Sequence, residues 1–254
     1  MSRYQALLLA GSRPGRDAFA ERYGAEMKAL IPIAGEPMVL RPLRALLASR
    51  QVEMVRILAQ DPDKLAPALP DAPGWSVEPS GGTIAETLEA VCSADSARWP
   101  MLVTTADHAL LNAAMIDQFC AEAAGADLAI GVVTKSALQK RLPQSRRTWI
   151  AFRRGKYTGA NLFAFGSPNA LQAVRLWRSV EQDRKKGWRL LLALGWPGLL
   201  GLLRLRTLDQ TLDAMGRRLG LSLRAVRLDD PLAAVDVDKP QDHELVTAIF
   251  ERRA

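Results

Sequence analysis

Short apolar runs alternate along the chain with stretches in which apolar residues recur every three or four positions. Such runs are typical of buried strands, and such spacing is typical of helices with one buried face. The expected strands are 4–10, 53–58, 75–78, 101–105, 128–133, 149–152, 161–165 and 221–228, with a last apolar strand that ends within 234–242. The expected helices are 39–47, 62–69, 84–91, 113–124, 170–186, 207–219 and a terminal helix that contains 245–250. This alternation predicts an α/β fold with a mostly parallel, doubly wound sheet.

The chain is long enough and apolar enough to bury one sizeable core, with 254 residues of which 48% are hydrophobic. We therefore expect a single domain over 1–254, with a helical insertion at about 167–220. The uncharged part of this insertion, 190–203, is shorter than the roughly 20 residues that span a bilayer. Two interpretations stay open: helices packed on the core or on a second subunit, or a peripheral membrane contact through 188–206. The oligomeric state is not readable from the sequence.

A basic, glycine-containing loop follows the first strand. Gly11 and Gly15 flank Ser12, Arg13 and Pro14, Arg16 comes next, and Lys28 lies further along. Glycine lets a backbone come close to phosphate oxygens, and arginine donates to them in a planar fork. The pattern predicts a cradle for a triphosphate. The alternative is a tight turn whose arginines are only solvated.

The stretch 9–38 resembles the opening of the nucleotidyltransferase superfamily. It has Leu-Ala-Gly at 9–11, a basic loop, Lys-Ala-Leu at 28–30 and Gly-x-Pro-Met at 35–38, in that order. The likeness extends to 78–110 and 230–245, and it includes the molybdenum-cofactor guanylyltransferase-like (NTP transferase) domain. It implies a Rossmann-like sheet of the GT-A type. It also implies a nucleotide site made of Leu9, Ala10, Gly11, Ser12, Arg13, Arg16 and Lys28, in which Arg13 and Lys28 are catalytic.

Residues Gly81, Gly82 and Thr83 precede an expected helix and allow two interpretations. Thr83 and Glu86 have the Thr-x-x-Glu spacing of a capping box, which would bind the first N–H groups of that helix. The resemblance instead implies that this loop faces the base and ribose of the nucleotide. Both roles stay open, and Thr83 can serve both.

Asp107 lies two residues after the end of the expected strand 101–105. Ligands of open α/β sheets lie beyond the carboxyl ends of strands, where a carboxylate can hold a Mg²⁺ that bridges triphosphate oxygens. A capping role is the alternative, although Asn112 already supplies a cap for the next helix. The resemblance implies the metal role, with a departure: a proline is common after this aspartate, but His108 stands here. We expect no catalytic role for His108, because an acceptor phosphate is already ionised near neutral pH.

Two further aspartates, Asp236 and Asp238, lie at the start of the terminal helix. Asp238 and Gln241 have the spacing of a helix cap, and Pro240 suits a first turn. Capping thus accounts for Asp238 but not for Asp236. The stretch 236–242 resembles the Asp-x-Asp-x-Pro-x-Asp ending of many nucleotidyltransferases, which implies that Asp236 first, and Asp238 second, completes the metal site.

The net charge is +7, and many of the basic residues fall within 141–156 and 175–227. An excess of this kind suits anionic partners, and no nucleic-acid-binding motif accompanies it. Around 155–159 we expect a hairpin turn between the strands 149–152 and 161–165. Its basic residues are either a solvated face or an acceptor-phosphate site, for which Arg147 is the candidate. Gly159 and Asn161 resemble the acceptor-facing residues of related enzymes.

Cys92 and Cys120 lie in apolar, helical settings without metal-ligand spacing, so we expect reduced core residues. No basic, apolar leader with a cleavage site opens the chain. We therefore expect a cytoplasmic location, with contact to the inner face of the membrane if 188–206 binds lipid.

Together these features predict a Mg²⁺-dependent nucleotidyltransferase. It would transfer a nucleoside monophosphate from a nucleoside triphosphate, CTP or GTP being favoured by the resemblance, to a phosphorylated small molecule and release pyrophosphate. One alternative is a glycosyltransferase that uses a nucleotide sugar, although Asp107-His108-Ala109 lacks the paired aspartates of that class. The other is a non-catalytic, membrane-associated binding protein.

Overall fold

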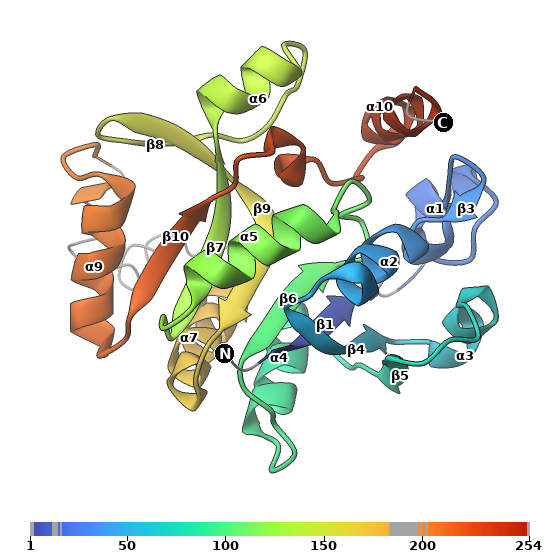
Figure 1. The fold of residues 1–254 in the computed structure, drawn as a ribbon, viewed down its shortest axis with the longest axis horizontal. Helices are drawn as coiled ribbons and strands as arrows, with labels where there is room; N and C mark the ends of the chain where they lie inside the picture. Colours follow the sequence, from blue (N-terminus) through green and yellow to red (C-terminus); the bar gives the residue numbers. More distant parts are fainter. Residues whose placement is uncertain are drawn as a thin grey trace.

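One eight-stranded sheet runs through the computed structural model, which describes residues 3–11, 15, 17–182, 198, 200–201 and 203–252 (Figure 1). The strands in spatial order are β10 (Leu223–Arg227), β7 (Leu128–Thr134), β9 (Gly155–Phe165), β6 (Met101–Thr105), β1 (Tyr4–Leu9), β4 (Val52–Ala59) and β5 (Trp75–Pro79), with β8 (Ile150–Phe152) paired to β9. Strands β6, β1, β4 and β5 are parallel, as are β10 and β7. Strand β9 is antiparallel to each of its partners, β6, β7 and β8. The predicted mostly parallel sheet is confirmed.

Helices cover both faces of this sheet (Figure 1). On β1, Ala6 and Leu8 belong to one hydrophobic cluster, whereas Leu7 and Leu9 belong to another. This split follows from the two-residue period of a strand, which sends alternate side chains to opposite faces. The first cluster contains buried residues of α2 (Leu40–Ala48) and α5 (Ala113–Ala123). The second contains buried residues of α4 (Ile84–Ser93) and α7 (Leu171–Gln182). The sheet is therefore doubly wound.

The remaining elements are short or lie at the periphery. Within the described residues, the other α-helices are α1 (Ala18–Arg22), α3 (Pro62–Leu65), α6 (Lys135–Arg141), α9 (Leu208–Leu219) and α10 (Pro240–Glu251). The 3₁₀ helices are η1 (Lys28–Leu30), η2 (Ala66–Ala68), η3 (Pro168–Ala170) and η4 (Pro231–Ala234). A two-stranded hairpin joins β2 (Pro32–Ile33) to β3 (Glu36–Pro37). Cys92 and Cys120 are buried free thiols, as predicted, and burial raises their pKa values to about 11 and about 12.

The hairpin before β9 differs from the sequence prediction. Residues 155–159, expected as a turn, belong to β9, and the turn lies at Arg153 and Arg154. Arg154 adopts the left-handed conformation, with φ of 73°. The glycines at 155 and 159 suggested a turn because glycine commonly supplies this conformation. Here an arginine supplies it instead.

A β-bulge interrupts β9 near the site. Between Ile130 and Val132 the partner on β9 moves from Phe163 to Gly159, so β9 has extra residues at this point. Asn161 lies in the bulge with a left-handed φ of 47°. Bulges re-aim side chains, and left-handed non-glycine residues cluster at functional sites. Gly131 of β7 lies opposite the bulge. A Cβ at this position would crowd the Cβ of Leu162 at 3.1 Å, so the missing side chain of glycine leaves room for the bulge.

The helical insertion is described only in part. Helices α7 and α9 lie between β9 and β10, which confirms helices at both ends of the predicted insertion. Its middle, 183–197 with 199 and 202, lies outside the described residues, and so do Trp188, Trp196 and most of 188–206. Among the residues that the structure describes, no helix has the length and apolar character to cross a membrane. The single-domain organisation over 1–254 stays a prediction.

Candidate active site

Several loops meet at the carboxyl edge of the parallel strands. The Ala106 N–H donates to the Leu9 carbonyl at 2.9 Å, so the chain segments leaving β6 and β1 are adjacent. The Ala10 N–H donates to Leu58 of β4 at 2.9 Å, and the Ser80 N–H, just after β5, donates to Ala59 at 2.8 Å. The loops that begin at Gly11, Ser80 and Ala106 therefore share one edge, where open α/β sheets bind ligands.

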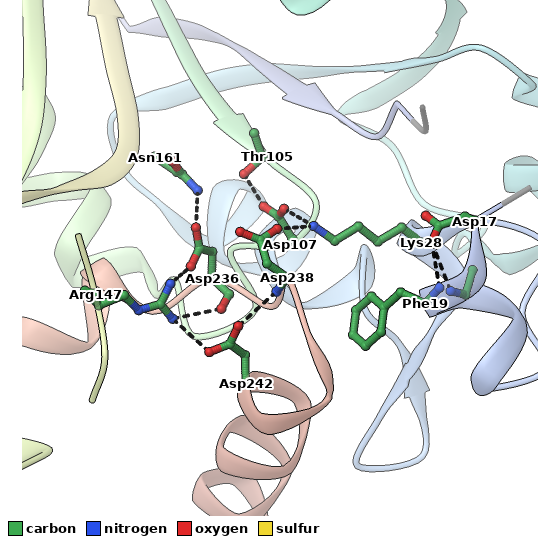
Figure 2. A network of polar contacts seen from close by, with 11 residues as sticks. Asp17, Phe19, Lys28, Thr105, Asp107, Arg147, Asn161, Asp236, Asp238 and Asp242 are labelled. Carbon is green, nitrogen blue, oxygen red and sulfur yellow. Dashed lines mark hydrogen bonds and ion pairs between the residues drawn. The ribbon is translucent and has the colours of Figure 1, made fainter. Parts of the chain in front are cut away.

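Lys28 lies between two carboxylates at this edge (Figure 2). Its ammonium is 2.5 Å from Oδ2 of Asp107 and 2.6 Å from Oδ1 of Asp238. The Thr105 hydroxyl donates to the other oxygen, Oδ1, of Asp107 at 2.5 Å. The Val237 N–H donates to the Asp107 carbonyl at 3.0 Å, which holds the C-terminal segment beside β6. Three distant parts of the sequence thus meet around one cation.

The charge of Lys28 is stabilised here in spite of its burial. Burial alone would lower the pKa of the Lys28 ammonium, but the attraction and hydrogen bonds of Asp107 and Asp238 outweigh it and raise the pKa above its ordinary value. The side chains of Lys28 and Asp107 are 21% and 17% exposed, so water screens this pair only partly. Lys28 is therefore cationic at neutral pH.

A second polar cluster lies beside the first (Figure 2). Arg147 forms an ion pair with the Asp236 carboxylate, donates to the Asp236 carbonyl at 2.9 Å, and lies 3.5 Å from Oδ1 of Asp242. The Asn161 amide, aimed by the bulge, donates to Oδ2 of Asp236 at 3.2 Å. The structure thus brings together Arg147 and Asn161, two of the three predicted acceptor residues. Gly159 lies in β9, two residues before Asn161, with open space at its α-carbon.

The two aspartates before α10 contact different partners, and their predicted order as metal ligands stays a prediction. Asp238, expected to cap α10, points to Lys28, and the N-cap position of this helix is Lys239, which makes no side-chain cap hydrogen bond. Asp236, expected first for the metal, faces Arg147 and Asn161 instead. The expected strand before it is the 3₁₀ helix η4. Asp236 and Asp238 are two residues apart in the extended segment after η4, so their assignment depends on backbone geometry that residue spacing does not give.

Asp242 is a site residue to which the sequence analysis assigned no role. Its carboxylate accepts a hydrogen bond from the Asp238 N–H at 3.3 Å and also approaches Arg147. It is largely buried, at 9% exposure, which is unusual for an aspartate without a positive partner. Asp242 therefore connects the Arg147 cluster to the segment that carries Asp238. Its only sequence signal was its place as the last aspartate of the 236–242 motif.

The predicted triphosphate loop is described in part. Leu9 and Ala10 are buried at the end of β1, and Gly11 is exposed next to Gln60, whose side chain a Cβ would meet at 2.9 Å. Gly15 has a φ of 99°, a conformation that favours glycine. The other predicted phosphate ligands of this loop, Ser12, Arg13 and Arg16, lie outside the described residues. Their contacts stay predictions.

The Gly81–Thr83 loop carries the predicted capping box. Thr83 accepts from the Glu86 N–H, and Glu86 accepts from the Thr83 N–H at 2.8 Å. Gly82 has a φ of 70°, and a Cβ there would collide with Oε2 of Glu86. The glycine is thus needed to let Glu86 reach back. The capping role is confirmed, and the nucleotide contact stays a prediction.

His108, next to Asp107, is fully buried below the site. Its Nδ1 lies 3.3 Å from the Thr104 hydroxyl, and burial lowers its pKa to about 4. The imidazole is therefore neutral at neutral pH and has no exposed surface for a substrate. This geometry agrees with the expectation that His108 is not a general base.

The two carboxylates around Lys28 suit a magnesium ion. Mg²⁺ binds through one or two carboxylates together with substrate phosphates, rather than in an all-protein cage. Asp107 and Asp238 provide such a pair, and the Asp236 carboxylate is already held by Arg147 and Asn161. No group of three or more histidine, cysteine or acidic side chains arranged to hold a metal occurs in the described part of the chain. The donor set fits a metal shared with a substrate.

Known proteins resemble this chain in sequence and in structure. Residues 6–195 match the sequence model of the MobA-like NTP transferase domain. A hypothetical transferase from Thermus thermophilus is 32% identical, with a TM-score of 0.80 over 95% of this chain and 99% of its own.

A CMP:2-keto-3-deoxy-manno-octonic acid synthetase solved with CTP has a TM-score of 0.62 at 14% identity, covering 100% of both chains. A 2-C-methyl-D-erythritol 4-phosphate cytidylyltransferase, also from Thermus thermophilus, has a TM-score of 0.53 at 16% identity, covering 98% of this chain and 99% of its own. The last two show a shared fold alone. No curated protein sequence gives a significant match.

Proposed function

The chain belongs to the MobA-like NTP transferase family, and from that premise we propose that it transfers a nucleoside monophosphate from CTP or GTP to a phosphorylated small molecule. An oxygen of the acceptor phosphate attacks the α-phosphorus of the triphosphate. The bond from the α-phosphorus to the bridging oxygen breaks, and pyrophosphate leaves. The product is a nucleoside-diphosphate-linked compound, and no covalent enzyme intermediate is required.

One observation carries this proposal: Lys28, Asp107 and Asp238 converge at the carboxyl edge of the sheet, beside the loop that begins at Gly11. A lysine and two carboxylates next to a glycine-containing loop suit a triphosphate and its counter-ion. Phosphoryl-type transfer depends mainly on such positioning and charge stabilisation. With an ionised acceptor, it needs no general base.

Each part of the site has a proposed role. Lys28, with Arg13 and Arg16, neutralises the charge that develops on the triphosphate, and Leu9 to Ser12 supply backbone contacts. Asp107 and Asp238 hold Mg²⁺, which when bound draws electron density from the phosphate oxygens and stabilises the leaving pyrophosphate. The loop Gly81–Thr83 faces the base and ribose.

The acceptor side consists of Arg147, Asn161 and Gly159. A guanidinium has five N–H donors, so the contacts of Arg147 to Asp236 and Asp242 are compatible with a further contact to an acceptor phosphate. Asp236 is assigned to position Arg147 and Asn161 rather than to hold the metal. Gly159 is exposed and has open space beside its α-carbon, which leaves room for the acceptor molecule.

The choice of CTP or GTP rests on resemblance. Two structures of the same fold are described by their names as a synthetase in complex with CTP and a cytidylyltransferase, which supports CTP as the first donor to test.

Release of pyrophosphate tests the proposed reaction. CTP, GTP, UTP and ATP are each incubated with Mg²⁺ and phosphorylated polyols, sugars and cofactors, with the Asp107→Asn protein as control. We expect one pairing to release pyrophosphate in step with product, and the control to release little. A glycosyltransferase would transfer sugar from a nucleotide sugar without releasing pyrophosphate. A binding protein would show a triphosphate-dependent rise in melting temperature at most, with no turnover.

A further inference from the structure

The Lys28 ammonium lies between the Asp107 and Asp238 carboxylates, where a metal ion held by both would also lie. The ammonium contacts one oxygen of Asp107 and one of Asp238, at 2.5 and 2.6 Å. These carboxylates come from the end of β6 and from the segment before α10, so no local sequence constraint pairs them. Two carboxylates held close together repel each other unless a positive charge lies between them. Lys28 supplies that charge from within the chain.

Contacts other than Lys28 hold the Asp107 carboxylate and the Asp238 backbone, whereas the Asp238 side chain itself is 59% exposed. The Thr105 hydroxyl holds the second oxygen of Asp107, and the Asp242 carboxylate accepts from the Asp238 N–H. Lys28, in contrast, reaches the pair with a flexible four-carbon stem from η1 (Figure 2). The ammonium can therefore leave while the Asp107 carboxylate and the Asp238 backbone keep their other contacts.

We propose that Lys28 is an internal placeholder that competes with a divalent cation for the Asp107–Asp238 pair in the nucleotide-free protein. This inference rests on the proposed function, because the arriving triphosphate is what draws Lys28 away. The ammonium moves to the phosphates, and the carboxylate pair becomes available to the metal. Metal and triphosphate then bind in a coupled way, and each raises the affinity for the other.

The placeholder has a chemical consequence for the free protein. While Lys28 neutralises half of the paired negative charge, a divalent cation must displace an existing ion pair before it binds. The nucleotide-free protein therefore holds metal weakly. Removing the ammonium removes the competitor, and both carboxylates remain available to a metal ion.

Binding of Mn²⁺ alone, in the absence of any nucleotide or acceptor, tests this directly by electron paramagnetic resonance or calorimetry. We expect Lys28→Met, which keeps the stem without the charge, to bind Mn²⁺ about tenfold more tightly than the unaltered protein, within the usual range of coupling between sites. Lys28→Arg keeps a cation and should bind as weakly as the unaltered protein. Lys64→Met is the matched control, because Lys64 forms an exposed ion pair with Asp61 at 2.8 Å, and it should leave Mn²⁺ affinity unchanged.

The experiment separates this inference from the proposed function, because it measures no turnover. Tighter Mn²⁺ binding by Lys28→Met supports the placeholder even if no triphosphate is ever consumed. Equal or weaker binding by Lys28→Met, or equally tight binding by Lys28→Arg, overturns it even if the protein releases pyrophosphate. If the bare carboxylate pair prevents Lys28→Met from folding, Lys28→Gln replaces it, since the amide can still donate to one carboxylate.

Discussion

At the scale of single residues, Asp107 is held from two sides: Thr105 donates to one carboxylate oxygen and Lys28 to the other. Asparagine has nearly the same shape but no charge, so Asp107→Asn should leave the fold intact. We expect it to lower turnover at least about a hundredfold, the scale of losing a key electrostatic stabiliser. Pyrophosphate release and thermal unfolding check both expectations.

The control for this change is Asp61→Asn, which removes an exposed carboxylate that pairs only with Lys64 among the contacts described. Exposed pairs contribute little to stability. We expect normal turnover from this variant. A large loss of melting temperature in Asp107→Asn, with turnover lost in proportion, would make Asp107 a structural residue.

Replacing Asp238 should change the affinity for metal, whereas replacing Asp236 should change the KM for the acceptor. Asp238→Asn weakens Mn²⁺ binding measured with triphosphate present, because Asp238 belongs to the pair around Lys28. Asp236→Asn leaves that affinity unchanged but raises KM for the acceptor, since Asp236 holds Arg147 and Asn161. Calorimetry and acceptor titrations provide the two readouts. The reverse pattern would restore Asp236 as the metal ligand.

The sequence allowed Lys28, Asp107 and the 236–242 segment to be predicted as one site, because each follows a strand or lies in a motif of recognisable spacing. It did not allow the contacts of Asp236 and Asp238 to be predicted. Asp238 and Gln241 have cap spacing, yet the Asp238 carboxylate contacts Lys28 and its backbone N–H donates to Asp242. That choice depends on three distant segments, which no local pattern reports.

At the scale of elements, the start of α4 offers a test of the Gly81–Thr83 loop. Thr83→Ala removes the side-chain cap and should lower the free energy of unfolding by about 1 kcal/mol. Thr83→Ser keeps the hydroxyl and should cost little. Chemical denaturation measures both, and the KM for triphosphate shows whether the loop also contacts nucleotide. An unchanged KM in a folded Thr83→Ala protein would leave this residue with a capping role alone.

The bulge in β9 makes a separate prediction at Asn161, whose left-handed φ is 47°. Both Asn161→Gly and Asn161→Ala lose the amide that binds Asp236, but only alanine is strained in this conformation, by about 1 kcal/mol. We therefore expect the glycine variant to be more stable than the alanine variant, with acceptor use impaired in both. Denaturation curves and acceptor KM values measure this. Equal stability would mean that the bulge relaxes when Asn161 is replaced.

Most elements could be predicted from the sequence, because buried runs and capping residues are local signals: β6 and the capping box at Thr83 match their expected positions. The position of the β8–β9 turn could not be predicted from the sequence. The glycines at 155 and 159 had the composition of a turn, but cross-strand pairing with Ile150 and Phe152 keeps that segment in β9. Tertiary pairing outweighed local preference there.

At the scale of the whole molecule, β9 runs antiparallel between β6 and β7. The sequence predicted a mostly parallel sheet but not this reversal, because hydrophobic periodicity carries no strand direction. The order of the strands was likewise not readable, since it is set by packing between distant segments.

The leucine-rich segment 188–206, with arginines at both ends, gives a prediction for the molecule as a whole. Leu203 and Leu205, at its described end, are 59% and 58% exposed on either side of Arg204. If this segment contacts lipid, the protein should bind anionic vesicles but not neutral ones, and salt should weaken binding, because each basic residue near the surface contributes about 1 kcal/mol.

Co-sedimentation of the unaltered protein and of Leu203→Glu/Leu205→Glu with both kinds of vesicle measures this contact. We expect the double variant to lose binding, and Leu47→Glu, which changes an exposed leucine on α2, to retain it. Equal binding by all three proteins would leave the two leucines without a role at lipid.

The order of the strands along the chain also bears on how the protein is made. Strands β1, β4, β5 and β6 all precede the rest of the sheet in the chain and pair with one another, so all the strands of this half are synthesised before β7, β9 and β10. The nascent half already carries Lys28 and Asp107. Asp238 arrives only after β10, and the pair that would hold the metal does not exist until then. If Lys28, Asp107 and Asp238 have the roles proposed above, a translation product that stops before Asp238 carries the lysine and one carboxylate of the site but lacks the second.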